Sequence, residues 1–261
     1  MLGWSIPLFR IRGIQLSLHW SFLALLAFVG WASWHDAAAQ AATVIRCWEA
    51  VGWNVGAVLV FFTCVVLHEL GHSFVAMAFG LGVQRILLMP IGGMAVFDEF
   101  PRQPARELLI TLAGPAVNFI IAGVLWLAVG LPPGWTPLFD GYPDNFTGFA
   151  QMLLHWNLLM GCFNFIPVFP MDGGRIFRAL LATRLTYVRA TFWAASVGKV
   201  LAVLGAGIAA YFFHAWLTVV LFAFIFSVGE LEYRSVKRRE EEAEHWRIWW
   251  ARQDVVTGSQ G

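Results

Sequence analysis

Charged side chains are scarce in this sequence. Only 13% of the 261 residues are charged, whereas 59% are hydrophobic, and the mean hydropathy is +0.68. Soluble domains carry about 25% charged residues, so a water-exposed surface could not be assembled from this composition. The formal net charge of +1 argues against a nucleic-acid partner, which would require a strongly basic surface. The composition therefore predicts a protein of the lipid bilayer that does not bind nucleic acid.

Cysteine is also rare. The sequence has three cysteines, and two of them, Cys64 and Cys162, fall within apolar segments, while Cys47 lies outside them. An odd number placed in this way argues against a disulfide framework. Internal repeats and Gly/Ser-rich linkers are absent from the sequence too, and it offers no room for a second folded domain.

Long apolar segments are what the sequence has instead. A hydrocarbon core about 30 Å thick needs roughly 20 apolar residues per helix. The first apolar stretch, Ile14 to Trp34, is too long for the apolar region of a cleaved signal peptide. We expect an all-α polytopic membrane protein with about six transmembrane helices and a short re-entrant β-hairpin between helices two and three. The expected spans are Leu16 to Trp34, Val55 to Phe79, Leu108 to Leu131, Gly148 to Ile166, Phe192 to Phe213 and Trp216 to Leu231.

The basic residues fix an orientation for these spans. Six spans place both termini on one side, and cytoplasmic loops are enriched in Lys and Arg. Arg46 is the exception on the other side, and Lys199 lies near the cytoplasmic end of span five. We therefore expect both termini in the cytoplasm of a multi-pass cell-membrane protein. The residues on the predicted cytoplasmic side are Arg10, Arg12, Arg85, Arg102, Arg106, Arg175, Arg178, Arg184, Arg189, Arg234, Lys237, Arg238, Arg239, Arg247 and Arg252.

The loop after the second span is unusually apolar from Ile86 to Phe97. Non-helical backbone is tolerated at membrane depth only where protein or a wet cavity satisfies it. We interpret this segment as the re-entrant or interfacial hairpin, and a surface loop with one amphipathic turn is the alternative. A hairpin here could accept another extended segment as an added strand.

After residue 232 the composition becomes highly charged, and Trp246, Trp249 and Trp250 follow. We expect residues 1–232 to form the six-helix domain and residues 233–261 to form a charged cytoplasmic tail. This tail is typical of an interfacial helix with tryptophan anchors, and a plain solvated tail is the alternative.

The central motif is HELGH, from His68 to His72. Histidines at positions i and i+4 share one helical face, so both imidazoles can reach one metal ion. Glu69 can act as the general base that accepts a proton from the attacking water. An ionisable group at bilayer depth costs about 2.5–3.5 kcal/mol, so three together imply a functional role over a structural polar cluster.

A catalytic zinc site takes three protein ligands and leaves a position open for water. Asp172 follows the helix-stopping Pro167 and Pro170 at about the depth of the two histidines, and two glycines come directly after it. The rivals Asp98 and Glu107 lie in a polar loop. We therefore favour Asp172 as the third ligand, together with His68 and His72, of one Zn²⁺ ion.

These motifs resemble those of the site-2 protease family of intramembrane zinc metalloproteases. The resemblance rests on HELGH, on GPAVN from Gly114 to Asn118, and on NFIPVFPMDGGR from Asn164 to Arg175. It implies that the two histidines and the DG aspartate bind zinc and that Glu69 is the base. The family more often has Leu where this chain has Met171, which is a change of little volume. PDZ and CBS domains, which many members carry, are absent from the sequence.

Other polar residues in the apolar spans invite two interpretations. Asn118 and Asn164 resemble family residues thought to contact substrate or the site, and could donate to an oxyanion. The alternative for each is an interhelical hydrogen bond of about 1 kcal/mol. We expect His19 and His155 to be structural histidines and Cys64 to be a small apolar filler.

The sequence thus predicts a zinc-dependent endopeptidase that hydrolyses peptide bonds in or near transmembrane segments of membrane protein substrates. The hairpin could pair with an unwound substrate as an added strand, and prolines at Leu88 and Val96 should then reduce cleavage and leave the zinc content intact. Two other classes stay open. The polar cluster could instead form the pathway of an ion or proton transporter, or the chain could be an inactive membrane scaffold, against which the retained Glu69 speaks. The sequence does not predict an oligomeric state.

Overall fold

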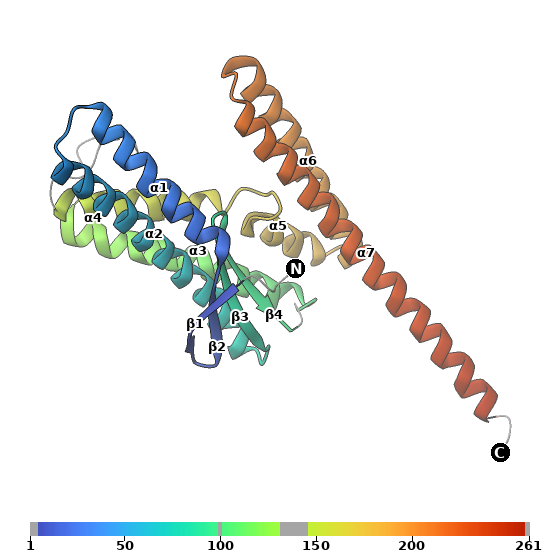
Figure 1. The fold of residues 1–261 in the computed structure, drawn as a ribbon. Helices are drawn as coiled ribbons and strands as arrows, with labels where there is room; N and C mark the ends of the chain where they lie inside the picture. The colour runs from blue at the N-terminus through green and yellow to red at the C-terminus, as the bar shows by residue number, and fades with distance from the viewer. Residues whose placement is uncertain (1–4, 99–100, 131–145, 259–261) are drawn as a thin grey trace. The chain divides into compact units, whose positions relative to one another are not determined.

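The computed structural model describes residues 5–98, 101–130 and 146–258. These residues form seven helices and four strands (Figure 1). The chain divides into two compact units. Unit 1 comprises Met1–Pro101 and Leu109–Phe163, and unit 2 comprises Arg102–Leu108 and Asn164–Gly261.

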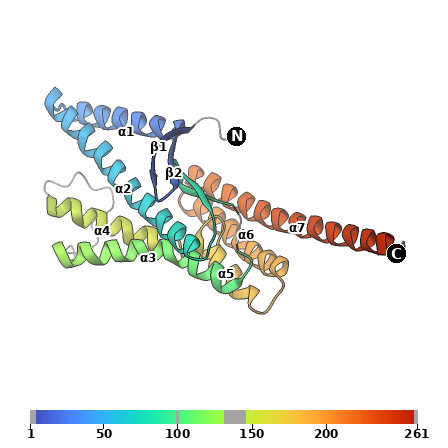
Figure 2. The ribbon, with the colours of Figure 1, turned by 90° about the horizontal axis from the view of Figure 1, so that it is seen from below.

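Unit 1 is built on long apolar helices. Helix α1 (Trp20–Ala39) packs against α2 (Val44–Ala78), and α3 (Pro104–Val129) and α4 (Phe146–Phe163) lie alongside α2 (Figures 1 and 2). At 1.5 Å per residue, the 35 residues of α2 extend about 52 Å, which is more than a bilayer core of about 30 Å.

A four-stranded sheet completes unit 1. Its order is β1 (Ser5–Ile11), β2 (Ile14–His19), β3 (Val83–Met89), β4 (Gly92–Phe97). The β1–β2 and β3–β4 pairs are antiparallel, while β2 and β3 run parallel. The segment predicted as a hairpin, Ile86 to Phe97, thus contains β4 and the second half of β3, but the sequence-based prediction missed β1 and β2. That the pair re-enters the membrane stays a prediction.

The predicted start of the first span at Leu16 was wrong, because Leu16 belongs to β2 and the helix begins at Trp20. His19 caps α1 by accepting a hydrogen bond from the Ser21 N–H at 3.2 Å. Leu16 pairs with Ile86 in the parallel register and is buried. A hydropathy window does not detect this pairing, because the partner strand lies far away in the sequence.

The sheet packs on the part of α2 that contains the predicted motif. Ile14 and Leu16 of β2, together with Ile86 and Leu88 of β3, share one buried cluster with α2. The α2 side chains in this cluster are Phe62, Val65 and Leu70. The sheet therefore supports the helix at the level of His68.

Five helices of the described residues are long and apolar enough to cross a membrane: α1, α2, α3, α6 and α7. Helix α4, which matches the predicted fourth span, is not among them because Gln151, His155 and Asn157 lower its hydropathy. The fold is therefore mostly helical with a small sheet, and a sixth span stays a prediction.

Unit 2 contains the short α5 (Asp172–Ala182) and the helical pair α6 (Tyr187–Phe212) and α7 (Trp216–Gly258). Small residues on α6 let α7 pack closely along it. The buried small residues of α6 are Ala190, Ala194, Ala195, Gly198, Ala202 and Ala209.

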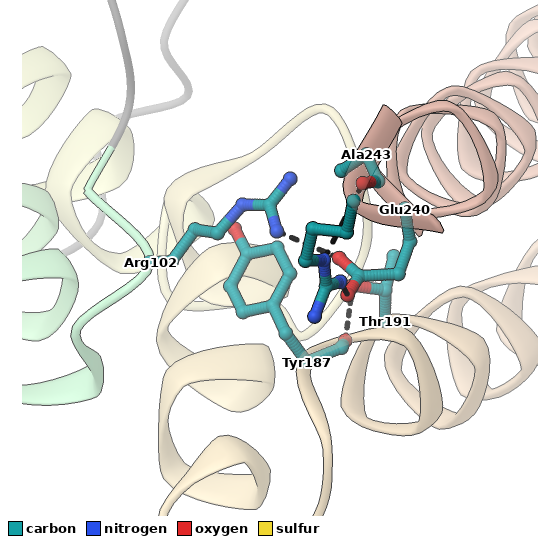
Figure 3. Close-up of polar contacts among 6 residues, drawn as sticks. Arg102, Tyr187, Thr191, Glu240 and Ala243 are labelled. Atoms are coloured by element: carbon teal, nitrogen blue, oxygen red, sulfur yellow. Dashed lines mark hydrogen bonds and ion pairs between the residues drawn. The ribbon is translucent and has the colours of Figure 1, made fainter. Parts of the chain in front are cut away.

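Helix α7 continues through residue 232, where we predicted the charged tail to begin. In this continuation, Arg102, which lies before α3, donates to Glu240 at 2.6 Å (Figure 3). Arg247 contacts the same carboxylate at 3.4 Å. Both contacts are solvent-exposed, and each contributes at most about 1 kcal/mol. The division at residue 232 and the interfacial position of the tail stay predictions.

Candidate metal centre

His68 and His72 lie on one buried face of α2. Their Nε2 atoms are 3.1 Å apart, and their rings are nearly perpendicular, at 88°. Both residues are buried, with 5% and 7% of their surface exposed. The i,i+4 spacing therefore directs the same ring atom of both histidines to one point.

The partners of the other ring nitrogens assign the tautomers. His72 Nδ1 lies 2.7 Å from the Ile110 carbonyl oxygen, which only accepts hydrogen bonds, so this nitrogen carries the proton. His68 Nδ1 lies 2.6 Å from the Asn118 side-chain oxygen. With both Nδ1 atoms protonated, the two Nε2 atoms direct lone pairs at each other across 3.1 Å. Such lone pairs repel unless a cation lies between them, so these residues fit a zinc ion.

Glycines let α3 approach this face of α2. A Cβ at Gly71 would lie 2.7 Å from the Ala113 carbonyl oxygen. A Cβ at Gly114 would collide with His72 Nε2 and would lie 2.8 Å from His68 Cε1. The glycine of the GPAVN motif therefore leaves the space that the two imidazole rings occupy.

Glu69 lies beside the histidines and faces the sheet. Its carboxylate accepts a hydrogen bond from the Ala95 N–H of β4 at 3.2 Å. A Cβ at Gly93 would lie 2.6 Å from Glu69 Cγ, so β4 can pass this close only with glycine there. Glu69 is half-buried, which suits a base that must meet both protein and water.

Asn118 is fully buried, and its side chain is used within the protein. Its oxygen contacts His68, and its nitrogen donates to the Asn157 oxygen at 3.0 Å. Asn157 donates in turn to Cys64 Sγ at 3.4 Å and to the Leu153 carbonyl oxygen at 2.8 Å. We call Asn118, Asn157 and Cys64 the amide chain. Its geometry favours the interhelical alternative for Asn118, and the substrate contact stays a prediction.

Sequence reasoning missed Asn157. The only indication was an amide in an apolar helix, as for Asn118 and Asn164. Cys64 is buried as predicted, but it accepts a hydrogen bond and so does more than fill space. His155 contacts its own helix, with Nδ1 3.0 Å from the Gln151 carbonyl oxygen.

In unit 2, Asp172 is the first residue of α5 and is 8% exposed. The two glycines after it allow a tight turn. A Cβ at Gly173 would collide with the Ile166 carbonyl oxygen, and a Cβ at Gly174 would lie 2.8 Å from Phe169 N. The Gly173 N–H donates to the carbonyl oxygen of the half-buried Asn164 at 2.5 Å. The DGG sequence therefore fixes how α5 starts and how its carboxylate is presented.

A buried ion cluster anchors the same helix. Arg178 donates to Glu107 through Nε at 2.8 Å and through Nη2 at 2.5 Å, and to Glu232 at 2.6 Å. Its guanidinium also lies over the rings of Phe169 and Tyr187, at 5.3 and 5.0 Å from their centroids. We call Arg178, Glu107 and Glu232 the arginine cluster. Burial opposes the charge of Arg178, but the two carboxylates outweigh it and raise the pKa of the guanidinium above its ordinary value.

The contacts of Glu107 and Asp98, the two rival candidates for the third metal ligand, can now be compared. Glu107 is fully buried and bound to Arg178, and Asp98 accepts a hydrogen bond from Gln84 at 2.6 Å. A carboxylate held by an arginine is a poorer metal ligand, because the cation competes with the metal. The contact with Arg178 therefore weighs against Glu107.

Comparisons with known proteins agree with this chemistry. The sequence profile of peptidase family M50 matches residues 56–147 and 140–205. A zinc metalloprotease of Methanocaldococcus jannaschii is 41% identical over 208 residues, which are 78% of this chain and 53% of that protein. Rip3 of Mycobacterium tuberculosis is 33% identical over 202 residues, which are 76% of this chain and 49% of that protein. The chain thus spans about half the length of these curated relatives.

A solved structure is also similar. The site-2 protease from Methanocaldococcus jannaschii aligns with a TM-score of 0.59 at 35% identity, covering 88% of this chain and 95% of that chain. The profile match extends over more than half of the present sequence and includes HELGH, GPAVN and the DGG segment. The chain therefore belongs to peptidase family M50, the site-2 protease family of zinc metalloproteases.

Proposed function

We propose that this chain is a zinc-dependent intramembrane endopeptidase that hydrolyses peptide bonds in or near transmembrane segments of membrane proteins. The observation that carries the proposal is the pair of buried Nε2 atoms, 3.1 Å apart in an apolar helix, with Glu69 directly beside them. Ionisable groups at this depth are expensive unless they have a function. Because the chain belongs to the M50 family of peptidases, we infer that this function is proteolysis.

His68, His72 and Asp172 would hold the zinc ion. Two imidazoles and one carboxylate are a donor set that could bind one metal ion, and they match the three protein ligands of catalytic zinc sites. When bound, zinc supplies Lewis acidity that activates water and polarises the scissile carbonyl. Glu69 would accept the proton of the attacking water and return it to the leaving amine.

The outer edge of the sheet would receive the substrate. A helical substrate hides its carbonyls in its own hydrogen bonds, so a cleavable segment must be extended. Of the two edge strands, β4 lies beside the motif, since Ala95 contacts Glu69. The proline test at Leu88 cannot probe this edge, because Leu88 is buried in β3, the neighbour of both β2 and β4.

Crosslinking can test the edge instead. Met94 on β4 and Leu8 on β1 are both exposed, at 41% and 48%. In a Cys162→Ala background, Met94→Cys should form a disulfide with a single-cysteine substrate segment, whereas Leu8→Cys should not. Equal crosslinking at both edges would contradict addition of the substrate to β4.

The decisive experiment for the activity is Glu69→Gln. Removing a general base should lower cleavage of a reconstituted single-span substrate about 10²- to 10⁴-fold, with zinc content unchanged. Glu49→Gln, at an exposed position of the same helix, is the matched control and should cleave normally. A transporter would instead carry metal or protons across liposomes without proteolysis, and a scaffold would lack both activities.

The ligand assignment has its own test. Asp172→Ala should abolish zinc binding, while Glu107→Gln should retain it. Retained zinc in the first variant with loss in the second would assign the third ligand to Glu107. Asn164 remains a proposed substrate contact, to be tested by a raised KM in Asn164→Ala.

The orientation is also proposed. Both termini would lie in the cytoplasm, with residues 1–232 as the membrane domain and residues 233–261 as a charged tail. Protease protection of terminal epitope tags in sealed vesicles would test this topology.

A further inference from the structure

Asn157 of α4 is 1% exposed, although nothing in the proposed reaction requires it. Its side chain makes three hydrogen bonds. The amide nitrogen donates to the Leu153 carbonyl oxygen and to Cys64 Sγ, and the amide oxygen accepts from Asn118. An amide buried in an apolar helix is costly unless its hydrogen bonds are made, so these three contacts hold the Asn157 side chain in one orientation.

In each of these contacts, the donor and the acceptor can be assigned. The Leu153 carbonyl oxygen only accepts, so it determines which end of the Asn157 amide is the nitrogen. The Asn157 oxygen must then face Asn118, which has to offer its nitrogen. The Asn118 oxygen is consequently left for His68, so His68 Nδ1 must carry the proton.

The Leu153 carbonyl oxygen therefore determines, through Asn157 and Asn118, which ring nitrogen of His68 carries the proton. A neutral imidazole has one proton, and with that proton on Nδ1 the Nε2 atom keeps its lone pair. His72 obtains the same tautomer from a single contact, with the Ile110 carbonyl oxygen. His68 has a side-chain amide at that position, and an amide can rotate by 180° and offer its nitrogen instead.

We propose that Asn157 is a positioning residue that locks the Asn118 amide and thereby holds His68 in the tautomer whose Nε2 can bind zinc. The inference rests on the proposed zinc site and adds to it a residue that does not contact the metal ligand directly. Asn157 acts only through Asn118.

Two variants separate this role from plain helix packing. Asn157→Leu removes both the acceptor for Asn118 and the donor to Leu153. In Asn157→Asp, a neutral carboxylic acid can donate to the Leu153 carbonyl and accept from Asn118, so the direction is kept. Asn54→Leu is the matched control, because Asn54 of α2 also makes an interhelical side-chain contact, donating to Ser33 of α1 at 2.6 Å.

The tautomer can be read directly. The ¹⁵N shifts of histidine rings distinguish protonated from unprotonated nitrogens, and the His68 signals can be assigned by their loss in His68→Gln. In metal-free protein reconstituted in lipid, we expect one tautomer, protonated at Nδ1, in wild type, Asn157→Asp and Asn54→Leu. Asn157→Leu should show a mixture of both tautomers.

Zinc affinity gives a second measure. Outer partners of metal ligands typically change affinity about 10- to 100-fold. Because Asn157 acts through a second residue, we expect the dissociation constant of Asn157→Leu to rise about 10-fold, and that of Asn157→Asp to stay within about 3-fold of wild type.

The outcomes are distinguishable. If Asn157→Leu keeps a single His68 tautomer and wild-type zinc affinity, the positioning role is refuted and the proposed function stands. Equal losses of zinc affinity in Asn157→Leu and Asn54→Leu would also refute it, since helix packing would then account for both. If wild type itself fails to bind zinc, the proposed function fails, whatever the tautomer of His68.

Discussion

Each unit contains a polar cluster connected to a predicted metal ligand, the amide chain to His68 and the arginine cluster to the helix of Asp172, and the two clusters are built from opposite chemistry. The amide chain behind His68 is neutral, and every bond in it has a donor and an acceptor that cannot be exchanged. The arginine cluster anchors the helix of Asp172 with full charges. The first kind of cluster can specify which nitrogen holds a proton. The second can only fix where a helix lies.

The two chemistries also differ in what a single substitution costs. A neutral hydrogen bond contributes about 1 kcal/mol net, so cutting the amide chain should leave the fold intact and alter the ligand. Removing one member of a buried ion pair strands the other charge and costs about 3–5 kcal/mol. Stability and metal affinity should therefore respond separately to substitutions in the two clusters.

The largest effect should follow from Arg178→Met. Glu107 is fully buried and accepts two hydrogen bonds from Arg178, so its charge would be stranded. We expect the free energy of unfolding to fall by about 3–5 kcal/mol. Unfolding of the purified protein in detergent micelles would measure this loss.

The double variant Arg178→Met with Glu107→Gln is the control. With neither charge left in the interior, it should recover much of the stability lost in the single variant. If single and double variants unfold alike, charge burial is not the cause, and the contrast between the two clusters fails.

A smaller effect should come from Gly114→Ala in unit 1. The added methyl group would collide with His72 Nε2 and press on His68. The rings can yield only by leaving their hydrogen bonds, so we expect zinc affinity to fall about 10- to 100-fold, with a smaller change in stability. Competition with a chelator would measure the affinity.

Gly123→Ala in the same helix serves as the comparison, because a Cβ there meets no atom within 4 Å. This variant should bind zinc as wild type does. Equal affinities for both alanine variants would show that the space at Gly114 is not needed by the metal.

The same contrast explains what the sequence could reveal. The spacing of His68 and His72 sufficed to place both imidazoles together, because helical geometry acts over one turn. The amide chain joins residues 39 and 93 positions apart and reaches His68 over 50 positions, and the arginine cluster joins residues 71 and 54 apart. Such pairs depend on how helices pack, which one sequence does not reveal.

The sheet was missed for a related reason. The β3–β4 segment could be anticipated from apolar residues on both sides of Pro90 and two glycines, since a hairpin is local. The partner β2 pairs with β3 in parallel across a long separation, and its residues extend the apolar pattern of α1. Hydropathy therefore assigned Leu16 to a helix, whereas parallel pairing with Ile86 makes it part of a strand.

The smallest effect should be that of Glu232→Gln. Glu232 is the second acceptor of Arg178, but its side chain is 34% exposed, so water already screens part of its charge. Arg178 would keep Glu107, and the new amide oxygen could still accept from Nη1. We expect a loss below about 1 kcal/mol in the unfolding measurement used for Arg178→Met. A loss as large as that of Arg178→Met would mean that the three residues stabilise the fold only together. The burial of each carboxylate would then not determine how much it contributes to the free energy of unfolding.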